Sequence, residues 1–389
     1  MPHPSSSTVV LLASVLKPVD DTRMFGKFAP TLAARPHTTV HVAGRGPGSA
    51  SAAAAPSGIQ QHVLFSGSRL SWSRLRAQWS YWQLLRRLRP DVVFVHAPEL
   101  LPLTLLWHGL DRQRQFVYDI RENYALNVTT QRVYGGLTRR ALAAGLRWIE
   151  TLAARRAAGV VLAERSYAEE LPFLRALPAG SVVVLENKYQ PAPAEALLSH
   201  SRTLPARHEP LELLYSGTIS ELNGVFEAIT FTQTLRQHWP LARLTIIGFC
   251  QRPDQLQRLT QVVAASHGAA MLIGGATLVP HAQIRAQIQR SHLGLLPYRP
   301  HPSTWRCVPT KLFEYLANGL PLLIPANDYW RRLVQQHGAG LVVGFDETFD
   351  AAAFVEVLTA SSFYLQGIPP EAFWHTEATK LRALLDTIR

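Results

Sequence analysis

The feature that most constrains the fold of this chain is the alternation of short apolar segments with longer amphipathic ones. Short runs that are apolar throughout are typical of parallel strands buried on both faces, and the helical segments between them cover such a sheet. The expected strands are Val9–Leu16, Thr38–Ala43, Asp91–His96, Gln115–Asp119, Gly159–Ala163, Val182–Leu185, Leu211–Tyr215, Leu244–Ile247, Ala270–Ile273, Leu293–Leu296, Leu322–Ile324 and Leu341–Val343. The pattern predicts an α/β protein with doubly wound parallel sheets.

A stretch without a clear period divides this pattern into two halves. It is rich in Pro, Ala, Ser and His, which favours an interdomain linker. We expect an N-terminal Rossmann-like domain over residues 1–195, a linker over 196–210 and a C-terminal Rossmann-like domain over 211–389. The last segment, 370–388, is expected to be helical and able to pack back on the N-terminal domain. Because ligands of doubly wound sheets bind at the carboxyl ends of the strands, the cleft between the halves is the expected site.

The charge and cysteine content limit the partners and the compartment. The formal net charge of +12 calls for an anionic partner such as a nucleotide, a phospholipid surface or a nucleic acid. No nucleic-acid-binding motif accompanies this charge, so we do not expect nucleic acid as the partner. Two cysteines, Cys250 and Cys307, provide neither a disulfide framework nor a metal-ligand cluster, which suits a reducing cytoplasm. No run reaches the roughly 18 apolar residues of a transmembrane helix.

The run PTKLFEYLANGLP at residues 309–321 combines a helix start, two opposite charges and a helix stop. Lys311 and Glu314 share one helix face at this spacing, and a helix N-terminus attracts phosphate. Such a site, which includes Thr310, can bind a nucleotide diphosphate and hold a ribose hydroxyl with the carboxylate. The alternative is an ordinary amphipathic helix whose charges are solvated.

The same run resembles the donor-site signature of family 4 glycosyltransferases. This family has the GT-B fold, in which two Rossmann-like domains face a central cleft. The resemblance implies transfer of a sugar from a nucleotide diphosphate donor to a glycan, a lipid-linked or a small-molecule acceptor, with retention at the anomeric carbon. It also implies no cofactor and no obligatory metal ion.

The resemblance extends to the loop after the first strand, where DTRMF matches a motif of one branch of the family. Asp21 and Arg23 are expected on the acceptor or phosphate side of the cleft, where Arg23 would contact an anionic group. The alternative is that Asp21 only caps the helix that follows.

Two further segments resemble family motifs that contain histidines. The segment FVHAPELLP keeps His96, but Ala97 stands where the family has an aspartate. In VYDIRENY, Arg121 occupies a histidine position, and an arginine can bind an anion but cannot act as a base. We expect His96, Arg121 and Glu122 to form the catalytic group that orients the acceptor. The alternatives are a structural role for His96, and helix N-capping or a salt bridge to Arg121 for Glu122.

The second half opens with YSGTISELNG, which resembles the family's diphosphate-binding turn. Family members often have an arginine after the glycine and a lysine five residues later, whereas this chain has Thr218 and Asn223. The backbone of Gly217 and the hydroxyl of Thr218 can still contact phosphate. The missing positive charge must come from elsewhere.

Arg306 and Lys311 are the candidates for that charge. Arg306 stands where many family members have the first glutamate of a Glu-x7-Glu pair, whose second member is Glu314. Tyr298 is expected to line the sugar or base pocket. A surface role is the alternative for Arg306.

Residues 69–90 contain six arginines, three tryptophans and no acidic residue. Their apolar stripe at helical spacing consists of Trp72, Leu75, Trp79 and Trp82. We favour a helix that packs this stripe in the core and exposes its arginines to solvent. The alternative is a helix on an anionic membrane surface, which would place a cytoplasmic protein peripherally at the inner face of the membrane.

The departures from the family motifs leave other functions open. One is a non-catalytic sugar-binding, nucleotide-binding or assembly subunit on the GT-B scaffold. Another is a GT-B sugar-nucleotide epimerase, against which the run PTKLFEYLANGLP argues.

Overall fold

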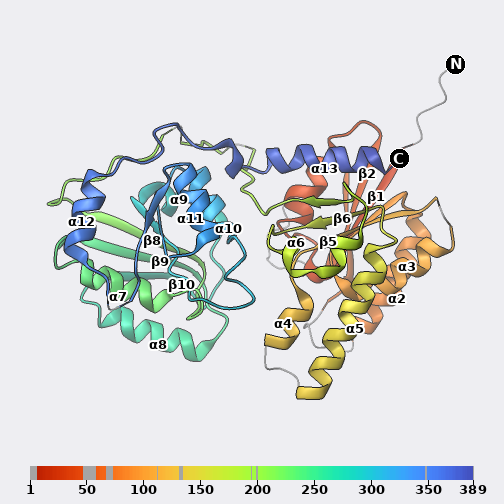
Figure 1. Ribbon diagram of the computed structural model, residues 1–389, viewed down its shortest axis with the longest axis horizontal. Helices are drawn as coiled ribbons and strands as arrows, with labels where there is room; N and C mark the ends of the chain where they lie inside the picture. Colours follow the sequence, from red (N-terminus) through yellow and green to blue (C-terminus); the bar gives the residue numbers. More distant parts are fainter. Residues whose placement is uncertain are drawn as a thin grey trace. The chain divides into compact units, whose positions relative to one another are not determined.

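The computed structural model describes residues 7–46, 58–66, 73–111, 113–130, 135–193, 195–198, 200–346 and 348–388. The chain forms two compact units, shown in Figure 1: unit 1 comprises residues 1–190 and 374–389, and unit 2 comprises residues 191–373. Each unit contains one sheet of parallel strands with helices between them, which confirms the predicted α/β class. No described helix is both long and apolar enough to cross a membrane.

The sheet of unit 1 has the strand order β3-β2-β1-β4-β5-β6-β7, and every pairing is parallel. The strands are β1 (Thr8–Pro18), β2 (Thr38–Arg45), β3 (Ile59–Phe65), β4 (Val92–Val95), β5 (Gln115–Ile120), β6 (Gly159–Leu162) and β7 (Val182–Val184). The helices are η1 (Met24–Phe28), α1 (Ala29–Ala33), α2 (Ser73–Leu88), η2 (Pro98–Leu100), α3 (Leu101–Gly109), α4 (Tyr124–Thr130), α5 (Gly136–Ala154), α6 (Tyr167–Glu170), η3 (Pro172–Ala176) and α13 (His375–Thr387). The strand order reverses between β1 and β4, which is where doubly wound sheets bind ligands.

Helix α13 completes the core of unit 1, although it is the last helix in the sequence. Leu381, Leu384 and Leu385 are buried in this core together with Trp374. The Trp374 indole also donates a 2.9 Å hydrogen bond from Nε1 to Thr31 Oγ1. The tail of the chain is thus part of the N-terminal fold.

Helix α2 does not bury the stripe that its tryptophans predict. Its buried residues are Ala77, Tyr81, Leu84 and Leu85, whereas Trp79 is 62% exposed; Trp72 lies outside the described residues. The helix packs through this second stripe, in which the Tyr81 hydroxyl also lies 2.8 Å from Thr104 Oγ1. The expectation that the tryptophan stripe packs in the core is therefore wrong at Trp79.

The sheet of unit 2 has the order β10-β9-β8-β11-β12-β13, again with parallel pairings. The strands are β8 (Leu211–Thr218), β9 (Ala242–Phe249), β10 (Ala270–Gly275), β11 (Leu293–Leu295), β12 (Leu322–Ile324) and β13 (Gly340–Val342). The helices are α7 (Val225–Leu235), α8 (Pro253–Ala264), α9 (His281–Arg290), α10 (Thr310–Ala317), α11 (Asp328–Gln336), α12 (Ala351–Ala360) and η4 (Pro370–Ala372). Here the order reverses between β8 and β11, so the ends of these two strands position the site of unit 2.

Candidate functional site

The first site lies in unit 2, where α10 presents Lys311 and Glu314 as its spacing predicts. Glu314 is only 5% exposed, and its two oxygens have different partners. Lys311 Nζ lies 2.5 Å from Oε2, and His281 Nε2 lies 2.6 Å from Oε1. His281 is the first residue of α9, and nothing in the sequence marked it as a partner of this carboxylate.

The electrostatics of this site keep the Glu314 carboxylate charged. Burial alone would raise its pKa, but the charge of Lys311 and the contact with His281 outweigh burial and lower the pKa to about 2. A carboxylate accepts hydrogen bonds only, so His281 Nε2 is the donor. A buried carboxylate that stays ionised can accept a hydrogen bond from a ligand hydroxyl.

Gly217 fixes the position of Lys311 beside the end of β8. A Cβ atom at Gly217 would lie 2.8 Å from Lys311 Cε, and the backbone φ of +106° further favours glycine. Tyr315 on α10 anchors the same strand end, since its hydroxyl accepts from Ser216 N at 3.1 Å. The Lys311 stem therefore lies over the Gly217 backbone at the end of β8.

The turn after β8 is held closed by Asn223, the residue at the family's lysine position. Asn223 Nδ2 donates to the Thr218 carbonyl at 3.0 Å, and so does the Tyr215 hydroxyl. Gly224 packs so closely on the next strand end that a Cβ would lie 1.8 Å from the Pro297 carbonyl oxygen. Asn223 thus provides turn geometry in place of a charge.

Tyr298 and Arg306 are placed against α11. Arg306 donates from Nε and Nη2 to the Tyr329 hydroxyl at 3.0 and 2.7 Å, and Tyr298 packs edge-on against Trp330. Thr310 is exposed at the first residue of α10. The structure thus brings Lys311, Glu314 and Gly217 into direct contact, and it anchors Arg306 on a different element.

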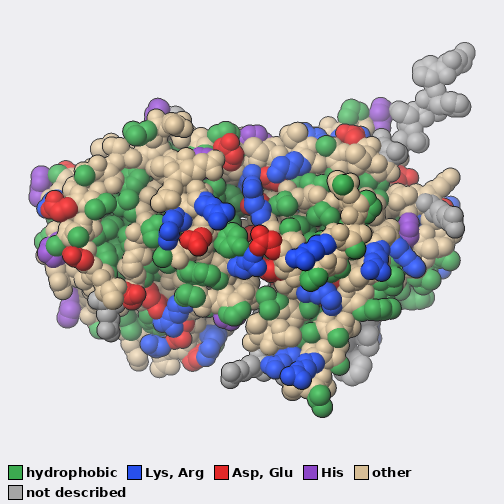
Figure 2. Space-filling view, in the orientation of Figure 1, with side chains coloured by type: hydrophobic (Ala, Val, Ile, Leu, Met, Phe, Trp, Pro, Cys, Tyr) green, Lys and Arg blue, Asp and Glu red, His purple; other side chains and the backbone are tan. Residues whose placement is uncertain are grey.

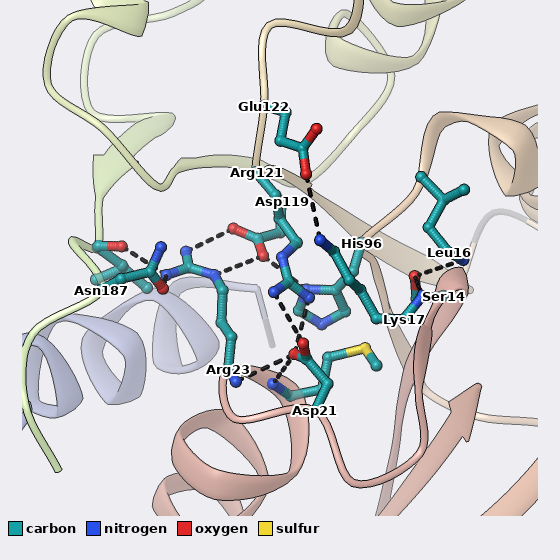
Figure 3. Close-up of polar contacts among 12 residues, drawn as sticks. Ser14, Leu16, Lys17, Asp21, Arg23, His96, Asp119, Arg121, Glu122 and Asn187 are labelled. Carbon is teal, nitrogen blue, oxygen red and sulfur yellow. Dashed lines mark hydrogen bonds and ion pairs between the residues drawn. The ribbon is translucent and has the colours of Figure 1, made fainter. Parts of the chain in front are cut away.

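The second site lies in unit 1 and is centred on Asp119, at the carboxyl end of β5 (Figure 3). Arg23 donates to both carboxylate oxygens, at 2.9 and 2.7 Å, and His96 Nδ1 lies 2.6 Å from Oδ2. All three residues are at most 1% exposed. Burial would raise the pKa of Asp119, but Arg23 and His96 outweigh it and hold that pKa far below its usual range.

Arg23 is also bound to the segment after β7. Its Nη1 donates to the Leu185 carbonyl and to Asn187 Oδ1, both at 2.8 Å (Figure 3). The guanidinium thereby joins the first loop, β5 and β7. This burial favours a structural role for Arg23 over the predicted contact with an anionic ligand.

His96 is completely buried beside Asp119. Burial lowers its pKa, even though Asp119 acts in the opposite direction, so the imidazole is neutral near pH 7. Its Nδ1 then donates to the ionised Asp119, and its Nε2 has no hydrogen-bond partner among the described residues. His96 lies at the predicted strand end, and its side chain has no solvent exposure.

The more accessible groups of this site are Asp21, Arg121 and Glu122. Asp21 caps η1 by accepting from the Met24 N–H at 3.0 Å, and its two oxygens pair with Arg121 at 2.8 and 3.1 Å. Glu122 pairs with Lys17 at 3.2 Å rather than with Arg121, and its side chain is 42% exposed. Lys17 had no sequence signal, because its pairing partner is distant in the chain.

Comparisons by sequence find similarity to known proteins over part of the chain. Residues 22–188 match the family described as "Glycosyl transferase 4-like domain". Glycogen synthase of Mycobacterium tuberculosis is 26% identical over 220 residues, which cover 56% of this chain and 49% of that protein. The chain thus spans about half the length of the curated relatives that it matches.

Solved structures extend the likeness to nearly the whole chain. Sucrose-phosphate synthase from Thermosynechococcus elongatus aligns with a TM-score of 0.66 at 14% identity, covering 98% of this chain and 99% of that one. HepE from Anabaena, solved with UDP and glucose, aligns with a TM-score of 0.65 at 12% identity and the same coverage. The lipopolysaccharide glycosyltransferase WaaG aligns with a TM-score of 0.58 at 16% identity, covering 98% and 94%. These likenesses confirm the predicted GT-B fold.

Proposed function

We propose that this chain, a GT-B protein with a glycosyl transferase 4-like domain over residues 22–188, transfers a sugar from a nucleotide diphosphate donor to an acceptor. The buried contact of Lys311, Glu314 and His281 beside Gly217 carries this proposal. The UDP and glucose held by HepE support a nucleotide sugar as the ligand of this fold.

The Lys311–Glu314 pair suggests how the donor is bound. In the absence of ligand, Lys311 neutralises Glu314 Oε2. When a diphosphate binds, Lys311 Nζ turns to the phosphate and frees Oε2 to accept from a ribose hydroxyl. His281 keeps Oε1 throughout, so the carboxylate does not lose its orientation.

The same lysine stabilises the reaction itself. As the bond between sugar and diphosphate breaks, negative charge grows on the leaving diphosphate, and Lys311 and the backbone N–H groups at Gly217 and Thr218 meet it. Because these groups supply positive charge, we propose that transfer needs no metal ion. Retention at the anomeric carbon is part of the proposal.

On the acceptor side, the Glu122 side chain is 42% exposed, whereas the Arg121 guanidinium is 10% exposed and paired with Asp21. Glu122 orients an acceptor hydroxyl, while Arg121 contacts an anionic group of the acceptor. His96 acts as a positioning residue, since it touches Asp119 and is itself buried. The acceptor class, whether a glycan, a lipid-linked or a small molecule, follows from the products of the assay below.

A panel of nucleoside diphosphates and nucleotide sugars tests the proposal by thermal shift. A ligand at 100 times its Kd should stabilise the wild type by about 2.7 kcal/mol. Glu314→Ala should bind the same ligand about tenfold more weakly, because a buried hydrogen bond to a charged group is lost. Glu356→Ala, on the surface of the same unit, is the control and should bind normally.

Product analysis then separates the functions that share this fold. Transfer or hydrolysis of a nucleotide sugar, unchanged by a chelator and with the anomeric configuration kept, supports the proposal. An epimerised nucleotide sugar would instead identify an epimerase. Binding without any turnover would identify a non-catalytic subunit.

We further propose that unit 1 associates peripherally with an anionic membrane surface through α5, not through the tryptophan stripe of α2. Leu137 is 83% exposed and Trp148 67% exposed on α5, which also carries Arg139 and Arg140. Figure 2 shows Lys and Arg side chains next to hydrophobic ones at the lower end of unit 1, where α5 lies. Exposed apolar side chains among arginines are typical of helices that lie in a membrane interface.

A further inference from the structure

A cavity of about 420 Å³ lies in unit 1 where α2 ends and where β4 and β5 begin. Three arginines line it, and Trp82 and Trp107 form part of its wall. The cavity is at the amino-terminal edge of the sheet, whereas Asp119 and Arg121 lie at the carboxyl edge. It is therefore separate from the site already described.

Two of the three arginines are not used by the fold. The side chains of Arg86 and Arg89 are exposed, and neither guanidinium forms a hydrogen bond or ion pair within the described part of the chain. Arg114 is fixed, because its Nη1 donates to the Trp107 carbonyl at 3.0 Å and its Nε lies 3.5 Å from Asp111. The cavity thus contains one oriented guanidinium and two that can turn toward a ligand.

The carboxylates of the cavity do not cancel this charge. Asp91 Oδ2 accepts from the Val9 N–H at 2.8 Å, and Asp111 caps its own turn by accepting from the Gln113 N–H at 3.0 Å. Three guanidiniums against two carboxylates leave a net positive charge. A basic cavity of this kind suits an anion with several acceptor oxygens.

Arg89 has a backbone conformation that the fold would give to glycine. Its φ is +45°, at the position just after α2, where a left-handed residue commonly ends a helix and is usually glycine. The following Pro90 further restricts it. Strained non-glycine residues of this kind are often found at ligand-binding sites.

We propose that this cavity binds a phosphate group, with Arg86, Arg89 and Arg114 as its ligands and Trp82 against the organic part of the molecule. Bidentate guanidinium contacts suit the oxygens of a phosphate monoester or diester. Such a group belongs to a soluble phosphorylated metabolite or to a phospholipid head group. The proposal is independent of glycosyl transfer at the other edge.

The test uses glycerol 3-phosphate in calorimetry, with glycerol as the uncharged probe, and vesicles of phosphatidylglycerol or phosphatidylcholine in sedimentation. The full chain is compared with an Arg86→Gln/Arg89→Gly double variant. The matched control, Arg175→Gln/Arg243→Gln, removes two exposed arginines elsewhere.

We expect the double variant to bind glycerol 3-phosphate about tenfold more weakly or worse, while the control binds like the wild type. The melting temperature of the double variant should not fall below that of the wild type, because Arg89→Gly relieves the strained backbone φ at position 89. If the ligand is a phospholipid, the double variant also loses affinity for phosphatidylglycerol vesicles beyond the control. If the ligand is a soluble phosphorylated metabolite, the double variant and the control bind phosphatidylglycerol vesicles with the same affinity. Equal binding of glycerol 3-phosphate by all three proteins, or binding by none, overturns the proposal.

Discussion

At the scale of single residues, the buried carboxylates of the two sites differ in the exposure of their partners. In unit 1, Asp119 is permanently neutralised by Arg23, and both are at most 1% exposed. In unit 2, Glu314 is shared between His281 and Lys311, whose side chain is 15% exposed. The first arrangement holds the fold together, since removing one partner of a buried pair costs about 3–5 kcal/mol. In the proposed function, the second pair opens when the donor diphosphate takes the place of Glu314 beside Lys311.

The depressed pKa of Glu314 predicts a pH dependence of stability in unit 2. The carboxylate has a pKa of about 2 in the folded protein, below its ordinary value of 4.5, so it stabilises the fold above pH 4.5 and loses this contribution as the pH falls toward 2. Between pH 5 and pH 3 we expect the wild type to lose about 2 kcal/mol more than Glu314→Gln, which has no proton to gain. Urea unfolding of both proteins at each pH measures the difference. If the free energy of unfolding of the wild type and of Glu314→Gln fell equally with pH, the carboxylate would not be ionised in a buried contact.

At the scale of elements, the residues that join α13 to unit 1 are the most informative. Trp374, Leu381, Leu384 and Leu385 are buried there with strands of the N-terminal half. A Cβ at Gly159, in β6, would lie 2.9 Å from Leu384 Cδ1, so strand and helix are in close contact.

Leu384→Ala should therefore destabilise unit 1 by about 2–5 kcal/mol, because it leaves a cavity under β6. Arg382→Ala, on the exposed face of the same helix, is the control. Hydrogen exchange followed by mass spectrometry distinguishes the units. The loss of protection should appear in β5 and β6; a loss confined to β8 and β9 would contradict the placement of α13.

Most strands were predictable, because buried parallel strands are apolar along their whole length. Strand β3 was not anticipated: its sequence IQQHVLF is polar in the middle, since it lies at the edge of the sheet. The Lys311–Glu314 contact was predictable from spacing within one helix. His281, Lys17 and the Arg23–Asp119 pair were not, because those contacts join elements that only the folded sheet brings together.

At the scale of the whole molecule, the arginines that contribute to the net charge of +12 have different roles. Much of the arginine of unit 1 is used inside it, as at Arg23 and Arg121, while α5 keeps Arg139 and Arg140 near exposed apolar side chains. Charge alone therefore does not determine where an anionic surface would bind. The exposed hydrophobic side chains beside the arginines determine the binding face.

Leu137→Glu should weaken sedimentation with phosphatidylglycerol vesicles about tenfold, since it removes an inserting side chain and adds repulsion. Leu365→Glu is matched to it, because both leucines are 83% exposed and Leu365 lies in unit 2. A higher salt concentration should weaken the binding of the wild type to phosphatidylglycerol vesicles, because salt screens the attraction between charges. Equal loss in both variants would mean that α5 is not the docking face.

The return of the chain to unit 1 at Trp374 also sets the order in which the protein can mature on the ribosome. Unit 2 is a continuous segment, so all of it is available before the last helix is synthesised. Unit 1 starts first and finishes last, with its core open along the face that α13 will cover. Until α13 is synthesised, a nascent chain exposes that apolar face to chaperones and proteases, and ribosome stalling shortly before Trp374 would leave the face uncovered.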